Sequence, residues 1–244
     1  MTQKIIEIRN LYFSYPDGKE ALNNISFNVF ERESLGIVGP NGAGKSTLFL
    51  HLNGLLRGKG SIKICGLDMQ DSNLLAIRKK VGLVFQNPDN QLFMPTVFDD
   101  VAFGPINLRL SKEEVTATVT EALKEVNMLE VAKRAAHHLS FGEKKKITIA
   151  TVTAMKPEIL VLDEPSSNLD PKGRRDLIKY IKNIKTTKVI ATHDLDLVGD
   201  VCDRIILLDN GRLITQGSVL DILCDKRLLE THGLEVPLSL SHRP

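Results

Sequence analysis

The chain has 244 residues, a hydrophobic content of 42% and a formal net charge of +2, so it is long and apolar enough for one large α/β unit or two small ones. The near balance of charge, without a basic patch, argues against a nucleic acid partner, and no apolar run approaches the roughly 20 residues of a membrane-spanning helix or reads as a secretory leader. The 3 cysteines are widely separated and match neither a zinc site nor a disulfide framework, which favours a reducing compartment.

The N-terminal segment is expected to form antiparallel strands. Two runs rich in β-branched residues, 5–8 and 25–29, flank a turn signal at Pro16-Asp17-Gly18. A further short run at 61–64 adds to the same layer. We therefore expect an antiparallel β layer that carries Tyr15.

A phosphate-binding loop follows. The loop fits the pattern G-x-x-x-x-G-K-[ST] and lies between an apolar run, 34–38, and a helical pattern, 46–52. Its glycines let the main chain turn N–H groups toward anionic oxygens, and the positive end of the helix adds to that field. The predicted nucleotide-binding residues are Gly39, Pro40, Asn41, Gly42, Ala43, Gly44, Lys45, Ser46 and Thr47.

Two side chains of this loop have individual predicted roles. Lys45 supplies a point charge to the β- and γ-phosphates of ATP. Ser46 offers a hydroxyl oxygen, which is a hard ligand for a hard cation, to Mg²⁺. ATP and Mg²⁺ are therefore the predicted cofactors.

A buried strand at 159–162 is expected to end on two carboxylates, Asp163 and Glu164. Continuous apolar runs are typical of parallel strands, and ligands of parallel sheets bind beyond the carboxyl ends of the strands. Asp163 at such an end is predicted to hold Mg²⁺ through water. Glu164 points elsewhere and is the predicted general base for the attacking water.

Two more apolar runs, 81–85 and 188–192, end on Gln86 and His193. Their place on neighbouring strands predicts that both side chains reach the same site. Gln86 is expected to bind Mg²⁺ or the attacking water, and His193 to contact the γ-phosphate.

Residues from about 95 to 155 differ from the rest, because their pattern is helical. Ser111 and Glu114 form a predicted capping box, and the apolar spacing that follows has a helical period. This block is expected to be an inserted helical subdomain. His137 and His138 are adjacent and face different ways on a regular element, which argues against a metal pair. Farther on, the runs 204–208 and 212–214 flank a hairpin turn signal.

In their order and spacing, these motifs resemble the ATP-binding subunit of ABC transporters over nearly the whole chain. The resemblance implies an α/β P-loop NTPase with a RecA-like parallel core sheet, an N-terminal antiparallel β layer and an inserted helical subdomain. It implies one ABC ATPase domain over 1–244, with about 1–94 and 156–244 as the catalytic core and β layer and about 95–155 as the helical signature subdomain. It also assigns further residues: Tyr15 to adenine stacking, 39–47 to Walker A, Gln86 to the Q-loop, 139–143 to the signature, 159–164 to Walker B, 167–170 with Asp170 to the D-loop and His193 to the switch histidine.

The signature motif implies a dimer. In the family, Ser140 and Gly142 would meet the γ-phosphate of ATP that is bound to the loop of a second subunit, which is a homodimer partner or a paralogous ABC ATPase. The physical basis is again a helix N-terminus that offers N–H groups to an anion.

Two residues depart from the commonest form of the signature. Phe141 replaces a glycine and is expected to face away from the phosphate. Glu143 replaces a glutamine, and its charge is unfavourable near phosphate unless lysines 144–146 offset it. The alternative for that lysine run is an ordinary solvated helix face.

A narrower resemblance concerns segments 85–105, 139–142 and 232–237, which are similar to the ATPases of energy-coupling-factor importers and of their cobalt/nickel branch. It implies an ATP-hydrolysing subunit, peripheral on the cytoplasmic face of the cell membrane, that energises import through integral membrane subunits docked near the Gln86 to Pro95 loop. The open alternatives are a vitamin importer or another ABC transporter ATPase, and a soluble ABC ATPase without a transport partner.

Overall fold

The computed structural model describes residues 3–237, and the strands in that range form two sheets. The strands are β1 (Lys4–Ser14), β2 (Glu20–Phe30), β3 (Ser34–Val38), β4 (Lys59–Ile64), β5 (Leu67–Asp68), β6 (Val81–Val84), β7 (Ile159–Asp163), β8 (Thr187–Ala191), β9 (Arg204–Asp209) and β10 (Arg212–Ser218). One sheet has the order β2-β1-β4-β5 and is antiparallel. The other has the order β10-β9-β3-β8-β7-β6, and its strands are parallel except for the β9–β10 hairpin.

The centre of the larger sheet is buried on both faces. Every residue of β3, β7 and β8 is buried, as is usual for parallel strands that are covered by helices. Strand β3 pairs with two strands from late in the chain, so that Gly36 faces Ile190 of β8 on one side and Ile205 of β9 on the other. The phosphate-binding loop after β3 therefore starts at the middle of the sheet.

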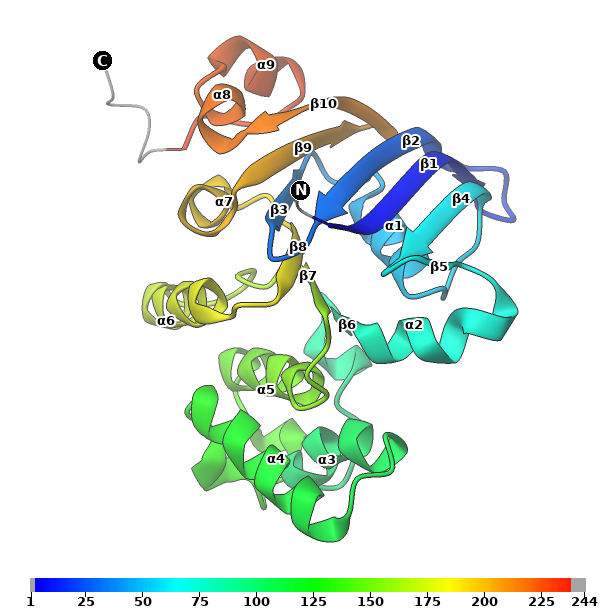
Figure 1. Cartoon of the computed structure of the whole chain (residues 1–244). Helices are drawn as coiled ribbons and strands as arrows, with labels where there is room; N and C mark the ends of the chain where they lie inside the picture. Colours follow the sequence, from blue (N-terminus) through cyan, green and yellow to red (C-terminus); the bar gives the residue numbers. More distant parts are fainter. Residues whose placement is uncertain (1–2, 238–244) are drawn as a thin grey trace.

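Helices cover the sheet on both faces and form a separate block at one end (Figure 1). The helices of the described residues are α1 (Lys45–Leu52), α2 (Leu74–Lys80), α3 (Val97–Asn107), α4 (Lys112–Glu125), α5 (Phe141–Thr153), α6 (Pro171–Asn183), α7 (Leu195–Val201), α8 (Val219–Leu223) and α9 (Lys226–Thr231). None of them is both long and apolar enough to cross a membrane.

The hydrophobic core is divided between the two faces. Leu48, Phe49 and Leu52 of α1 pack between the antiparallel layer and the larger sheet. Leu177 and Ile181 of α6 pack on the opposite face, together with residues of α5 and α7. This layering, with the parallel core, the antiparallel layer and the inserted helices, confirms the predicted α/β fold class.

Helices α3, α4 and α5 share a core of their own, built from residues between Val97 and Ala154. The predicted capping box at the start of α4 is confirmed, because Ser111 Oγ accepts the Glu114 N–H at 3.2 Å and Glu114 Oε2 accepts the Ser111 N–H at 2.8 Å. The predicted strand at 81–85 is one residue shorter. The Phe85 N–H leaves the ladder and donates to Gln91 Oε1 at 3.1 Å.

Candidate functional site

A pocket of about 390 Å³ lies where the parallel strands end. Its lining includes residues 41–47 of the predicted loop, together with Gln86, Asp163, Glu164 and His193, which follow or end β6, β7 and β8. Tyr15 and residues 19–21, 167 and 168 complete the lining. Four side chains from three separate segments of the sequence are thus brought together with the loop, as ligand sites of open parallel sheets require.

The phosphate-binding loop wraps closely against neighbouring main chain. A Cβ atom at Gly39 would lie 2.0 Å from the carbonyl oxygen of Leu208, so only glycine fits. Gly44 has φ +100° and stands at the N-cap of α1, where a left-handed backbone favours glycine. Lys45 is buried, and its Nζ donates to the carbonyl oxygens of Gly39 at 2.6 Å and Pro40 at 3.0 Å. The loop therefore presents a buried cation within a ring of main-chain groups, and burial lowers the pKa of Lys45.

Asp163 closes the pocket opposite the loop. Its Oδ1 is buried and, within the described residues, has no hydrogen-bond partner. Burial raises the pKa of Asp163, while a hydrogen bond with Ser46 acts in the opposite direction. An unpartnered buried carboxylate oxygen beside a serine hydroxyl fits a hard cation such as Mg²⁺, whose remaining ligands are usually water and phosphate. Residues 3–237 contain no cluster of three or more His, Cys, Asp or Glu side chains that would make an all-protein metal cage.

Glu164 is buried and has φ +46°, a left-handed conformation that is uncommon for a side-chain-bearing residue. Its Oε2 accepts a hydrogen bond from Thr192 Oγ1 at 3.0 Å and lies 2.9 Å from His193 Nδ1. Its carbonyl oxygen accepts from Lys145 Nζ and from Ser167 Oγ, both at 2.8 Å. Several partners therefore fix both the side chain and the unusual backbone of this residue.

Hydrogen bonds of Asp194 hold the turn that follows His193. Its carboxylate accepts from Arg174 Nε at 2.6 Å and from Ser166 Oγ at 2.9 Å, and it caps α7 by accepting the Leu197 N–H at 3.0 Å. Burial acts to raise the pKa of Asp194, but these hydrogen bonds outweigh it and lower the pKa. The sequence gives no local signal for this cluster, because its members come from separate segments.

Tyr15 lies at the rim of the pocket. Its hydroxyl group is 2.9 Å from Thr47 Oγ1, and its ring packs edge-to-face on Phe13 with the ring centroids 5.0 Å apart. The side chain is thus held in place beside the loop, where it lines the pocket.

The predicted signature residues stand at the start of α5. Ser140 is the N-cap and forms a second capping box with Glu143, whose Oε2 accepts both the Ser140 N–H and the Ser140 hydroxyl at 2.8 Å. These bonds, first from the backbone and then from the side chain of Ser140, lower the pKa of Glu143, with a smaller contribution from Lys146. The pattern S-x-x-E in the sequence could have indicated this box.

The lysines after Glu143 do not form one solvated face. Lys144 pairs with Asp89, with Nζ and Oδ1 2.7 Å apart, and Lys145 is fully buried. The alternative of an ordinary solvated face is therefore wrong for Lys145. Sequence reasoning missed its contact with Glu164, since lysine in a charged run does not signal burial.

Five predicted site residues are absent from the pocket lining. Two of them, Gly39 and Pro40, open the phosphate-binding loop, and their carbonyl oxygens accept from Lys45 Nζ. The lining, which is drawn from the described part of the chain, also leaves out Ser140, Gly142 and Asp170. Asp170 instead caps α6, where its Oδ1 accepts the Gly173 N–H at 3.1 Å. Within one chain, the pocket is therefore assembled without the start of α5.

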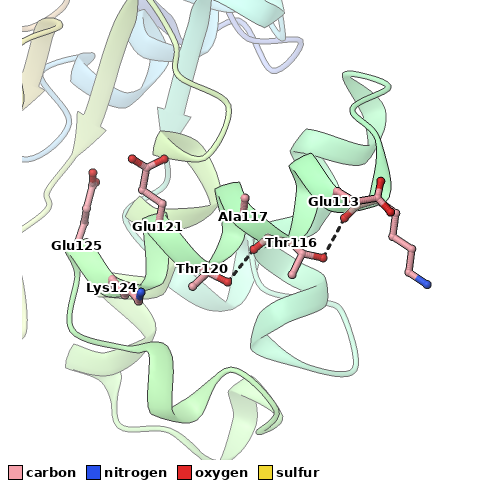
Figure 2. Close-up of a pocket in the computed structure, with 8 residues that line it drawn as sticks. Glu113, Thr116, Ala117, Thr120, Glu121, Lys124 and Glu125 are labelled. Carbon is pink, nitrogen blue, oxygen red and sulfur yellow. Dashed lines mark hydrogen bonds between the residues drawn. The ribbon is translucent and has the colours of Figure 1, made fainter.

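A larger hollow of about 990 Å³ runs along the outer face of α4 (Figure 2). Its polar side chains carry charges of both signs, and Thr116 and Thr120 donate their hydroxyl hydrogens to carbonyl oxygens of the same helix. Its lining contains no phosphate-binding loop, buried lysine or buried carboxylate like those of the smaller pocket, and we assign no reaction to it.

Comparisons with known proteins agree with this geometry. A family model described as ABC transporter matches residues 22–167. The chain is 49% identical over 237 residues to the energy-coupling factor transporter ATP-binding protein EcfA of Carboxydothermus hydrogenoformans. The aligned region covers 96% of this chain and 87% of that protein. The structure of cbiO1 from Clostridium perfringens, described as part of the ABC transporter complex cbiONQ, has a TM-score of 0.82 and 37% identity over 93% of this chain and 94% of that chain. A dimeric, post-hydrolysis structure of the ATP-binding cassette MJ0796 with ADP and Pi has a TM-score of 0.80 and 28% identity over 88% of this chain and 98% of that chain.

Proposed function

Since the chain belongs to the ABC transporter family, as an ATP-binding subunit that hydrolyses ATP, we propose that it powers a membrane importer of the energy-coupling-factor type. The observation that carries this proposal is the pocket itself. Lys45, Gln86, Asp163, Glu164 and His193 converge on one phosphate-binding loop. The similar proteins are named as an energy-coupling factor transporter ATP-binding protein and as part of an ABC transporter complex.

We propose that ATP binds with its adenine against Tyr15 and its phosphates in the loop of residues 39–47. Lys45 exchanges its bonds to Gly39 and Pro40 for the β- and γ-phosphates, and the loop N–H groups complete the cradle. Ser46, Gln86 and Asp163 would hold Mg²⁺, which would supply positive charge against the phosphate oxygens. The unpartnered Oδ1 of Asp163 supports this assignment.

Hydrolysis is proposed to start from Glu164. Its carboxylate takes a proton from water as the water oxygen attacks the γ-phosphorus, and the bond from that phosphorus to the ADP oxygen breaks. His193 would hold the γ-phosphate while the carboxylate moves from Thr192 and His193 to the water. The contacts at 3.0 Å and 2.9 Å keep Glu164 beside the pocket before that step.

The active form is proposed to be a dimer that holds two ATP molecules between its chains. Ser140, Gly142 and Asp170 do not line their own chain's pocket, which supports a role at the pocket of a second chain. The start of α5 offers N–H groups to an anion, and a similar cassette was solved as a dimer. An identical chain and a paralogue both fit this arrangement.

The docking surface for the membrane subunits is proposed to be the Gln86 to Pro95 loop with the adjoining side of α3. Phe93, Phe103 and Ile106 are exposed by 66%, 46% and 60%, and the two phenylalanine rings stack edge-to-face. Buried Asp100 fixes this loop by accepting the N–H groups of Phe93 at 2.9 Å and Met94 at 3.0 Å. An exposed aromatic side chain on a fixed loop, next to exposed apolar side chains of α3, suits a protein interface at the cytoplasmic face of the membrane.

The importer's substrate is proposed to be Co²⁺ or Ni²⁺. The resemblance of segments 85–105, 139–142 and 232–237 to the cobalt/nickel branch of the energy-coupling-factor ATPases supports this proposal. Cells that carry the wild-type chain are expected to take up radiolabelled Co²⁺ or Ni²⁺, and cells that carry Lys45→Met are expected to lose that uptake. If neither metal responds while a labelled vitamin does, the metal assignment is wrong and the vitamin importer replaces it.

Replacing Phe93 and Phe103 with serine is expected to release the protein from its membrane partners. Hot-spot aromatic residues contribute at least about 2 kcal/mol each, so co-purification with integral membrane proteins should fall more than about tenfold. ATP hydrolysis by the purified protein should remain. Leu220→Ser is the matched control, because Leu220 is 52% exposed on α8, away from this loop. Equal loss of co-purification in the control and the double variant would contradict this docking surface.

A further inference from the structure

Lys145 is a fully buried lysine that joins the signature helix to the hydrolytic loop. Its relative exposure is 0%, and its Nζ donates to the Glu164 carbonyl oxygen at 2.8 Å. An ammonium group is costly to remove from water, so a buried lysine on a helix indicates a specific interaction. The contact joins α5, which begins at the signature, to the residue proposed as general base.

The surroundings of Lys145 suit a cation. The carboxylates of Asp163 and Glu164 favour its charged form, although burial has the larger effect and lowers the pKa of Lys145 to about 8. The Phe141 ring lies one helical turn earlier, with its centroid 5.8 Å from Nζ, which is within the range of a cation–π contact. With Lys45, the site has two buried ammonium groups and two buried carboxylates, which balance in charge.

The position of Lys145 along α5 connects its contact with Glu164 to the signature residues. Ser140 caps the helix, and Lys145 lies three residues after Gly142, or about 4.5 Å along the helix axis. Because a helix moves as a stiff unit over one turn, a shift at Gly142 is carried to Lys145. The Glu164 backbone, with φ +46°, depends on donors to its carbonyl oxygen.

We infer that Lys145 is a positioning residue that orients Glu164 toward the attacking water. Through Lys145, this orientation depends on the contact between the signature helix and the partner subunit's ATP. The inference rests on the proposed dimeric ATPase. Lys145 itself does not line the pocket, so it acts through Glu164. Phe141, which replaces the usual glycine, places its ring beside the ammonium group of this lysine.

The test is Lys145→Met, which keeps the unbranched apolar stem and removes the donor. Glu164 still keeps the Ser167 hydroxyl, so the variant should fold with a Tm close to that of the wild type. We expect kcat for ATP hydrolysis to fall about tenfold or more, because a small misplacement of a reacting group has a large effect on rate. The KM for ATP should stay within about twofold, since the phosphate-binding loop is untouched.

Lys188→Met is the matched control. Lys188 is also a buried lysine whose Nζ donates to main-chain carbonyl oxygens, at 2.8 Å to Ile184 and 3.3 Å to Ile181, but it lies near the opposite end of β8 from the pocket. Its kcat should match that of the wild type. If Lys145→Met does not fold, Lys145→Gln is measured in its place, and its shorter amide should lower kcat by about threefold or more.

The outcomes separate this inference from the proposed function. Wild-type hydrolysis and an ATP-dependent dimer of Glu164→Gln test the proposed ATPase on their own. With both present, a wild-type kcat in the folded Lys145 variant overturns the inference alone. A fall in kcat that Lys188→Met shares, or one that comes with a raised KM, also overturns it. A lower kcat at unchanged KM and Tm, restricted to Lys145, supports it.

Discussion

Glu164→Gln is expected to lower ATP turnover by about a hundredfold or more while ATP still binds. Glutamine has the shape of glutamate, and its amide can keep a contact with Thr192, but it cannot accept a proton from water. ATP should therefore stay intact between two chains. The measurement is the rate of phosphate release together with light scattering in the presence of ATP and Mg²⁺.

Glu158→Gln is the control for this variant. Glu158 immediately precedes β7, at the end of the strand opposite Glu164, and pairs with Lys80 in a solvent-exposed ion pair. Its replacement should leave turnover near the wild-type value, because exposed ion pairs contribute little. A Glu164→Gln protein that turns over ATP at the wild-type rate as a monomer would sink the proposed mechanism.

Lys45→Met is expected to weaken ATP binding by roughly 10- to 100-fold, which corresponds to the loss of a hydrogen bond to a charged group. The methionine fills the buried stem position, so the loop and α1 should keep their structure. Titration with ATP in the Glu164→Gln background measures binding without hydrolysis. Turnover in the otherwise wild-type chain should fall by about a hundredfold or more.

The control for Lys45→Met is again Lys188→Met, which removes a buried ammonium group far from the loop. Its affinity for ATP should equal that of the wild type. If both variants lose affinity to the same extent, the effect belongs to the stability of the sheet. Unchanged affinity in Lys45→Met would remove Lys45 from phosphate binding.

The sequence predicted most of the fold because the relevant signals are local. The continuous apolar runs predicted β3, β7 and β8, and the turn signal predicted the hairpin at Asp209-Asn210-Gly211. The strand at 81–85 was one residue too long, because the Phe85 N–H is bonded to a side chain, that of Gln91, six residues later. The sequence did not predict the position of helix α2, because its seven residues are too few for a clear periodic pattern.

The order of the motifs determined the family and brought Lys45, Gln86, Asp163, Glu164 and His193 to one pocket. Each motif is a short pattern at the end of a strand, and parallel strands align those ends. Only the tertiary structure decided how these residues are held. The hydrogen bonds between Ser140 and Glu143 are local and can be predicted from the sequence. The partners of Glu164 instead come from α5, from the residue that follows β8 and from the segment after β7. Burial of Lys145 depends on the packing of α5 against the sheet, and a run of lysines in a sequence carries no record of that packing.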